Sequence, residues 1–246
     1  REERLHFGEP GREQLQVYES LRRKFKRSIE ERVTQKGIDG ARMYILEAML
    51  RLRQAAILPS LVDPDYHSVP SVKLDQLEEL VQTIRSEDNK ALVFSQFTAV
   101  IDEVERRLTG SGSGGGPQCF RIDGSTPQRA RGGQIDAFQN HEGSAVFLIS
   151  LKAGGFGINL TAADYVILLD PWWNPAVEAQ AIDRAHRIGR TGNVIAYRLI
   201  TAGTIEEKML RLQEHKRGLA ESIIRSDAGG LTGLSTEDLE WLFDKS

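Results

Sequence analysis

The chain has 246 residues, of which 40% are hydrophobic and 27% are charged, and its formal net charge is −3. This composition is ordinary for a globular protein with a sizeable core, and the slight acidity gives no overall basic footprint for nucleic acid. The one cysteine, Cys119, excludes an internal disulfide and a cysteine-rich zinc site, and it suits a reducing, intracellular compartment. No apolar run approaches the roughly 20 residues that span a bilayer, so we expect no membrane association.

The first third of the chain has a helical pattern. Two glycines within residues 36–40 interrupt it, so we expect one helix before them and a second after them that ends at Pro59. A third helix is expected after Ser71. Residues 12–53 hold 11 Lys/Arg against 6 Asp/Glu, which fits either a solvated helix surface or a surface that faces DNA. The apolar residues spaced by three or four on the first helix are Tyr18, Leu21, Phe25, Ile29 and Val33.

Residues 88–203 alternate short apolar runs with helical patterns. Nearly continuous hydrophobic strands of this kind predict a parallel sheet with helices on both faces. In such a sheet, ligands gather at the loops beyond the carboxyl ends of the strands. A glycine-rich connection is expected at 110–116. The predicted strands are 91–94, 119–122, 146–149, 165–169 and 194–200.

A long helix is expected from Thr204, where apolar residues recur at near-heptad spacing. The glycine pair at 229–230 ends this pattern. Residues 235–238 (Ser-Thr-Glu-Asp) then have the form of a capping box, which predicts a last short helix before the C-terminal end of the sequence. The chain begins with Arg1 and not with methionine, so we expect an excised or processed piece.

Small hydroxyl residues follow the strand predicted at 119–122. Residues 123–126 read Asp-Gly-Ser-Thr and precede a helix expected near Pro127. A helix N-terminus presents free N–H groups and the positive end of its dipole, which suits phosphate. The same residues are also typical of an ordinary helix cap, so both interpretations stay open.

A glycine-rich turn follows the strand predicted at 146–149. Residues 150–157 (Ser-Leu-Lys-Ala-Gly-Gly-Phe-Gly) include Gly154, Gly155 and Gly157, which permit close approach by a ligand or another backbone. The turn contains neither the Gly-Lys-Ser/Thr of a phosphate-binding loop nor the Gly-x-Gly-x-x-Gly of a dinucleotide site. By itself it is either a ligand-contacting turn or an irregular connection.

Two arginines lie one helical turn apart after residues 170–175 (Asp-Pro-Trp-Trp-Asn-Pro). Arg184 and Arg187 share a face of the helix predicted there. They would serve either in local ion pairs or in stabilising charge on a transferring phosphoryl group. His186 stands between them without a cluster of further ligands, so we expect no metal site.

Together, these segments resemble the SWI/SNF-type DNA translocases of helicase superfamily two. Residues 150–160, 170–175 and 180–189 are similar to motif V, the tryptophan block and motif VI of that family. The resemblance extends in order over roughly residues 15–243. The further matching segments are 52–61, 71–74, 92–97 (motif IV), 121–126 and 204–208.

The resemblance implies an ATP site shared between two lobes. In this family two RecA-like lobes clamp ATP and move along duplex DNA, and the first lobe supplies the phosphate loop and the acidic motif that holds Mg²⁺. ATP and Mg²⁺ would therefore be bound mainly by an N-terminal lobe. The second lobe supplies arginine fingers, here Arg184 and Arg187, and a glycine turn near the nucleotide, here Gly154, Gly155 and Gly157.

The resemblance also implies contacts with the DNA backbone. Such contacts position the protein without reading bases, so we expect little sequence specificity. Arg190 stands where the family usually has glutamine, so the role of that glutamine is not carried over. Trp172 is expected to pack in the core. The implied DNA-binding residues are Ser95, Gln96, Gly124, Ser125, Thr126, Lys152 and Trp173.

We therefore predict an α/β fold, a RecA-like parallel sheet with helices on both faces, an N-terminal helical extension and a C-terminal bracing helix. The predicted boundaries are a linker and protrusion at 1–87, the helicase core at 88–203 and the bracing helix and tail at 204–246. The expected partners are double-stranded DNA, the N-terminal lobe of the same protein and a DNA-bound target protein. The expected location is intracellular and DNA-associated, in the nucleus or the nucleoid.

Two other functions stay open, a non-catalytic DNA or protein scaffold and a strand-separating helicase lobe. A scaffold needs neither an arginine pair nor a glycine turn, and the tryptophan block favours movement on duplex DNA. The sequence contains no Gly-Lys-Ser/Thr and no Asp-Glu-x-His string. We expect the complete protein to be an ATP hydrolase and this chain alone to be inactive.

Overall fold

The computed structural model describes residues 2–110, 116–150, 160–172, 175–183, 185, 192–215 and 235–246. The chain divides into two compact units. One, which holds most of the sheet, comprises Arg1–His6, Lys73–Asp170 and Ala176–Leu199. The other is mainly helical and comprises Phe7–Val72, Pro171–Pro175 and Ile200–Ser246. The boundaries predicted at residues 87 and 203 stay a prediction.

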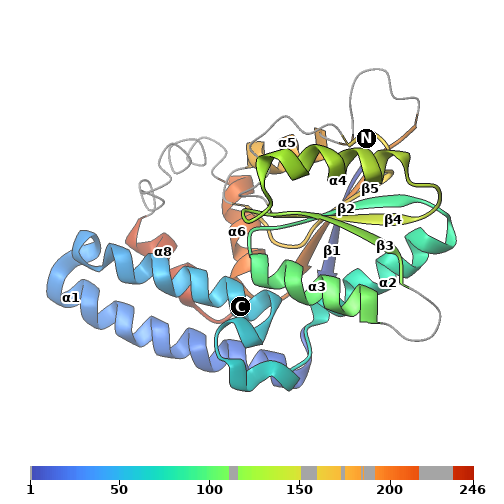
Figure 1. Ribbon diagram of the computed structural model, residues 1–246. Coiled ribbons are helices and arrows are strands. Elements are labelled where there is room, and N and C mark those ends of the chain that lie inside the picture. The colour runs from blue at the N-terminus through green and yellow to red at the C-terminus, as the bar shows by residue number, and fades with distance from the viewer. Residues whose placement is uncertain are drawn as a thin grey trace. The chain divides into compact units, whose positions relative to one another are not determined.

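The sheet has six strands in the order β1-β6-β5-β2-β4-β3 (Figure 1). The pairings of β3 with β4, β4 with β2, β2 with β5 and β5 with β6 are all parallel, which confirms the predicted RecA-like sheet. The edge strand β1, beside β6, was not predicted, because it opens with three charged residues and has no apolar run. The strands are β1 Glu2–Gly8, β2 Lys90–Ser95, β3 Gln118–Ile122, β4 Ala145–Ser150, β5 Tyr165–Leu168 and β6 Ile195–Thr201.

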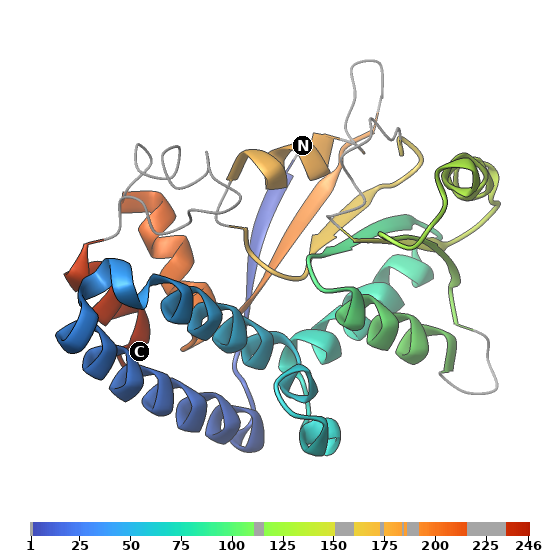
Figure 2. The ribbon, with the colours of Figure 1, turned by 60° about the vertical axis from the view of Figure 1, so that its left-hand side comes forward.

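Helices cover both faces of this sheet, as its apolar strands require. All six residues of β4 are buried, so both of its faces need cover. In Figures 1 and 2, α2 (Val72–Ser86) and α3 (Thr98–Gly110) lie on one face, and α4 (Gln128–Asn140) and α5 (Pro175–Asp183) lie on the other. The five predicted strands and the helices predicted between them are therefore present. The long helix predicted from Thr204 is present as far as His215, and its continuation toward residues 229–230 lies outside the described residues.

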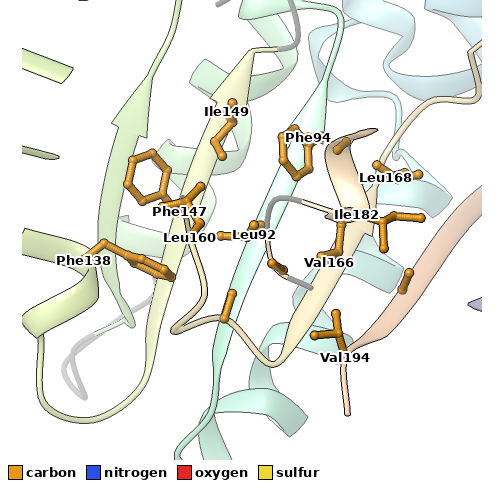
Figure 3. Close-up of a cluster of buried hydrophobic side chains, with 14 of the residues drawn as sticks. Leu92, Phe94, Phe138, Phe147, Ile149, Leu160, Val166, Leu168, Ile182 and Val194 are labelled. Atoms are coloured by element: carbon orange, nitrogen blue, oxygen red, sulfur yellow. The ribbon is translucent and has the colours of Figure 1, made fainter. Parts of the chain in front are cut away.

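Aromatic and branched side chains form the core between the sheet and the helices α4 and α5 (Figure 3). Phe138 of α4 meets Phe147 of β4 edge to face, with ring centroids 5.1 Å apart. Ile182 of α5 is fully buried in the same cluster. Each such side chain contributes about 1.5–3 kcal/mol through burial, and this packing fixes the helix that ends at Asp183.

The helical unit is built on α1 (Arg12–Ile57), which folds back on itself at Gly37 (Figures 1 and 2). Gly37 has φ 70° and ψ 174°, a conformation open to glycine and strained for other residues. The two arms pack together, and Phe25 meets Tyr44 edge to face at 5.9 Å. The predicted break within residues 36–40 is confirmed.

Side chains from other segments cap the C-terminal end of α1. The amide of Gln14 donates to the carbonyls of Ala55 and Ala56 at 3.4 and 3.2 Å, and the Thr201 hydroxyl donates to Ala56 at 2.7 Å. The Ser71 hydroxyl donates to the carbonyl of Ile57. The last carbonyls of a helix have no partner within it, so these donors stabilise its end ahead of the 3-10 turns at Pro59–Leu61 and Pro64–Ser68.

Two further helices pack against α1, namely α6 (Ile205–His215) and α8 (Thr236–Phe243). Ser235 and Asp238 form the predicted capping box at the start of α8. At its other end, Arg22 donates to the Phe243 carbonyl at 2.8 Å and Lys208 donates to the Trp241 carbonyl at 2.8 Å. Cations at a helix C-terminus complement its dipole, so they hold α8 on the unit.

Candidate functional site

Four parallel strands bring their following loops to one edge of the sheet. The register pairs Ser95 at the end of β2 with Ser150 at the end of β4. It also pairs Ile149 with Ile122 at the end of β3, and Phe94 with Leu168 at the end of β5. The segments that begin at residues 96, 123, 151 and 169 therefore leave from the same carboxyl edge, where parallel sheets bind ligands.

Asp170 holds the turn that follows β2. Its Oδ1 accepts the Ser95 hydroxyl at 2.7 Å, and its two oxygens accept the Gln96 N–H at 3.3 and 3.2 Å. The Ser95 hydroxyl also accepts the Phe97 N–H at 3.1 Å. Ser95 is 0% and Asp170 is 2% exposed, so the buried carboxylate and the hydroxyl fix the backbone of the predicted motif IV turn.

Asp123 organises the loop that follows β3. Its Oδ1 accepts the backbone N–H of Ser125 at 2.8 Å and the Ser125 hydroxyl at 2.6 Å. The Thr126 hydroxyl accepts the Asp123 N–H at 3.0 Å. The helix cap itself is Pro127, which makes no side-chain cap bond, so the hydroxyls shape a tight loop and are not the cap of α4.

Arg121 pairs with three carboxylates around this loop. Its guanidinium lies 2.6 Å from Asp123, 2.6 Å from Asp102 and 2.8 Å from Glu105. Burial raises the pKa of Asp123, but the hydrogen bonds from Ser125 and Arg121 outweigh burial and lower it to about 2. Asp123 is therefore ionised at neutral pH, and the loop keeps its shape there.

The loop presents its outer residues to solvent. Gly124 and Ser125 are exposed and Thr126 is half-buried. Arg131 of α4 donates to the Thr126 carbonyl at 3.1 Å, which holds the loop from its helical side. The structure thus places Gly124, Ser125 and Thr126 together in one exposed loop, and it places Ser95 and Gln96 together with Asp170.

The helix α5 leads directly into the predicted finger Arg184. Within α5, Glu178 is 1% exposed, and its Oε2 lies 3.2 Å from Nε of Arg198 on β6. Arg198 also pairs with Glu3 of β1 at 3.0 Å. The Glu178 carboxylate is buried and Arg198 is half-buried, so separating them would leave a buried charge without its counter-ion. This pair ties α5 to β6.

The other predicted site residues lie outside the part of the chain that the structure describes. They comprise both fingers, the glycine turn, its lysine and the DNA-contacting tryptophan: Arg184, Arg187, Gly154, Gly155, Gly157, Lys152 and Trp173. The structure describes residues that flank the segments in which they lie. Ser150 ends β4 at the carboxyl edge, and the half-buried Trp172 precedes position 173.

Sequence reasoning missed the residues that organise these loops. Asp170, Asp123 and Arg121 stood inside the quoted motifs, but no role was given to them. A usable signal was present for Asp123, since it directly follows a strand and an aspartate in such a turn often accepts the N–H two residues further on, here that of Ser125. For Asp170 no local signal was present, because its partners Ser95 and Gln96 come from another segment. The three carboxylate partners of Arg121 come from separate segments, so spacing did not reveal them.

Within the described ranges of the chain, no three or more His, Cys, Asp or Glu side chains lie together as candidate metal ligands. Among the helices of the same ranges, none has the length and apolar character needed to cross a membrane.

Comparisons with known proteins match this geometry. A family model described as "Helicase conserved C-terminal domain" matches residues 72–189. The solved Sulfolobus solfataricus SWI2/SNF2 ATPase C-terminal domain is similar over 100% of this chain and 99% of that one, with 30% identity and a TM-score of 0.76. The chain belongs to the SWI2/SNF2 ATPase family. It corresponds to the C-terminal lobe of these ATP-dependent helicases and remodellers.

Other SWI2/SNF2 proteins show the extent of the likeness. The Sulfolobus solfataricus SWI2/SNF2 ATPase core in complex with dsDNA has 30% identity and a TM-score of 0.78 over 100% of this chain and 50% of that one. The Bacillus subtilis putative ATP-dependent helicase/translocase YwqA is 39% identical over 95% of this chain. The chain spans 25% of the length of that relative, and so it represents one part of such a protein.

Proposed function

We propose that this SWI2/SNF2 lobe forms half of an ATP-dependent motor that moves on double-stranded DNA. The observation that carries the proposal is the shared carboxyl edge, at which β2, β3, β4 and β5 all end. Two of these loops are held in fixed shapes by Asp170 and Asp123. A relative of similar fold is an ATPase core in complex with dsDNA, which supports DNA as the ligand.

The nucleotide half of the proposal rests on the segments after β4 and on α5. Arg184 and Arg187 would act as arginine fingers, because a guanidinium stays charged and its fork of donors matches phosphate oxygens. Gly154, Gly155 and Gly157 would shape a turn close to the nucleotide. An N-terminal lobe of the same protein would hold the phosphates and Mg²⁺, whose positive charge offsets the charge that develops during phosphoryl transfer.

The DNA half uses the exposed loop after β3 and the turn after β2. Gly124, Ser125 and Thr126 lie in a loop whose backbone is fixed before any ligand binds, which reduces the entropy cost of contacting a phosphate. Ser95 would act through its carboxylate-held turn, since its side chain is buried, and Gln96 would reach the DNA backbone from that turn. Lys152 and Trp173 would complete the contact, and a DNA-bound protein would be the target that the motor displaces.

The substitution Arg187→Ala in the complete protein tests the nucleotide half. Loss of an arginine finger should lower ATP turnover by about 10³-fold or more, since such a residue stabilises charge in the transition state. Steady-state ATP hydrolysis with saturating duplex DNA measures the effect.

Arg190→Ala serves as the matched control, because Arg190 lies three residues further along and departs from the family pattern. It should leave turnover within about threefold of the unaltered protein, a change of less than 1 kcal/mol in the barrier. Near-normal turnover by Arg187→Ala would remove Arg187 from the site and give weight to a non-catalytic scaffold.

A further inference from the structure

Two side chains of the helical unit donate to the carbonyls of consecutive residues just ahead of position 173. Nη2 of Arg53, on the second arm of α1, donates to the Pro171 carbonyl at 3.2 Å. The side-chain amide of Gln213, on α6, donates to the Trp172 carbonyl. Arg53 is 7% exposed, and Pro171 is buried as well.

These bonds fix a backbone that has left the sheet. The N–H of Leu169 is still bonded to the Phe94 carbonyl at 3.0 Å, but residues 171 and 172 lie beyond β5. A buried carbonyl outside a strand or helix needs a donor from elsewhere. Here the donors come from two different helices, and the one from Arg53 is charge-assisted and so among the stronger kinds.

We propose that Arg53 and Gln213 are positioning residues that orient the peptide planes of Pro171 and Trp172, the two residues that precede position 173 in the sequence. This inference rests on the proposed function, in which Trp173 contacts DNA. Neither residue is proposed to touch nucleotide or DNA. Their loss should therefore weaken activation by DNA while the affinity for ATP stays the same.

Four variants of the complete protein test whether Arg53 and Gln213 act by donating hydrogen bonds to the Pro171 and Trp172 carbonyls or only by filling buried volume. Gln213→Glu keeps the shape of the side chain but sets a carboxylate oxygen against the Trp172 carbonyl. Arg53→Met keeps most of the buried volume without a donor, and Arg53→Lys restores one. Glu214→Gln is the matched control, because Glu214 is exposed at the next position of α6.

The first measurement is ATP hydrolysis over a range of duplex DNA concentrations. For Gln213→Glu and Arg53→Met, the DNA concentration at half-maximal activation should rise about tenfold, the size expected for a lost hydrogen bond. The KM for ATP should stay within about twofold. Arg53→Lys should recover at least half of the loss, and Glu214→Gln should show none.

The second measurement is hydrogen exchange of the peptide that covers residues 169–176, without DNA. Gln213→Glu and Arg53→Met should speed exchange there about tenfold, because the segment opens more easily, and leave the strands β2 and β4 unchanged. Unchanged exchange at 169–176 in Gln213→Glu would overturn the positioning role, and because Gln213 is half-buried that variant serves even if Arg53→Met fails to fold.

Trp173→Ala distinguishes this inference from the proposed function. If Trp173→Ala has normal activation by DNA, then the DNA role of position 173 is wrong, while faster exchange in Gln213→Glu would still support the positioning role. If Trp173→Ala loses activation and Gln213→Glu retains it with unchanged exchange, then the positioning role is wrong and the proposed function stands.

Discussion

At the scale of single residues, two buried aspartates fix the backbone of the turns in which the motif hydroxyls lie. Asp170 and Asp123 each accept a serine hydroxyl and a backbone N–H at a strand end. A carboxylate has room for several donors, so one side chain can fix a whole turn. The exposed residues Gly124 and Ser125 are thereby held in a loop of fixed shape.

The substitution Asp123→Asn should lower the free energy of unfolding of the chain by about 1–3 kcal/mol at pH 7, because the Arg121 guanidinium loses its buried charged acceptor. The folded-state pKa of about 2 lies below the unfolded value, so the carboxylate stabilises the fold above the unfolded pKa. This stabilisation is lost as the pH falls toward 2. Urea unfolding at pH 7 and pH 3 measures the difference.

The difference between Asp123→Asn and the unaltered chain should shrink as the pH falls through this window. Asp136→Asn is the control, since Asp136 is an exposed carboxylate on α4 of the same unit. It should change stability by less than about 0.5 kcal/mol at either pH. A destabilisation by Asp123→Asn that stays equal at both pH values would contradict the assigned role of the charge.

At the scale of elements, the hairpin of α1 depends on one residue conformation. Gly37 alone takes a non-helical conformation within α1, and its positive φ turns the chain back. The apolar faces of the two arms then bury each other, as the Phe25–Tyr44 contact shows. The end of the second arm is closed by donors from Gln14, Thr201 and Ser71, so the arm is fixed at both ends.

The substitution Gly37→Ala should destabilise the chain by about 1–3 kcal/mol, since alanine resists this region of φ and ψ. Thermal unfolding followed by circular dichroism measures the change. Gly132→Ala is the matched control: Gly132 lies inside α4, and a Cβ there meets nothing within 4 Å. There alanine should stabilise by about 0.5–1 kcal/mol, so equal signs for the two substitutions would contradict the turn's dependence on glycine.

At the scale of the whole molecule, the proposed function gives this lobe one part of an ATP site. The described residues of this SWI2/SNF2 chain form a sheet edge with ordered loops, and the sequence contains no phosphate-binding loop of the Gly-Lys-Ser/Thr type. In the proposed function the nucleotide is held between this lobe and another. Catalysis then depends on two lobes closing on the same nucleotide.

The isolated chain should therefore show no ATP hydrolysis above background, with or without duplex DNA, since in the proposed function the groups that hold the phosphates and Mg²⁺ would be on the other lobe. A phosphate-release assay at high protein concentration measures this. Turnover that duplex DNA stimulates would contradict a site divided between lobes.

For the complete protein, a strand-displacement assay separates movement along duplex DNA from strand separation, and we expect no displacement.

Much of the fold could be predicted from the sequence because local patterns decide it. Short, mostly apolar runs predicted β2 to β6, and helical spacing, Pro59, the Gly37 break and the Ser235 capping box predicted the helices. The strand β1 was not predicted, because it opens with three charged residues and pairs with β6 from the far end of the chain. A pairing between residues nearly 200 positions apart leaves no local signal.

For the candidate site too, the sequence determined one part and the tertiary structure another. The order of the motifs by itself determined the family and the lobe, which the comparisons confirm. Only the tertiary structure decided that Ser95 turns its hydroxyl toward the buried Asp170, and that Arg53 and Gln213 hold the backbone before position 173. A motif records which residue types are near in sequence, whereas the partner of a buried polar group is set by packing of distant segments, where it must find a donor or an acceptor.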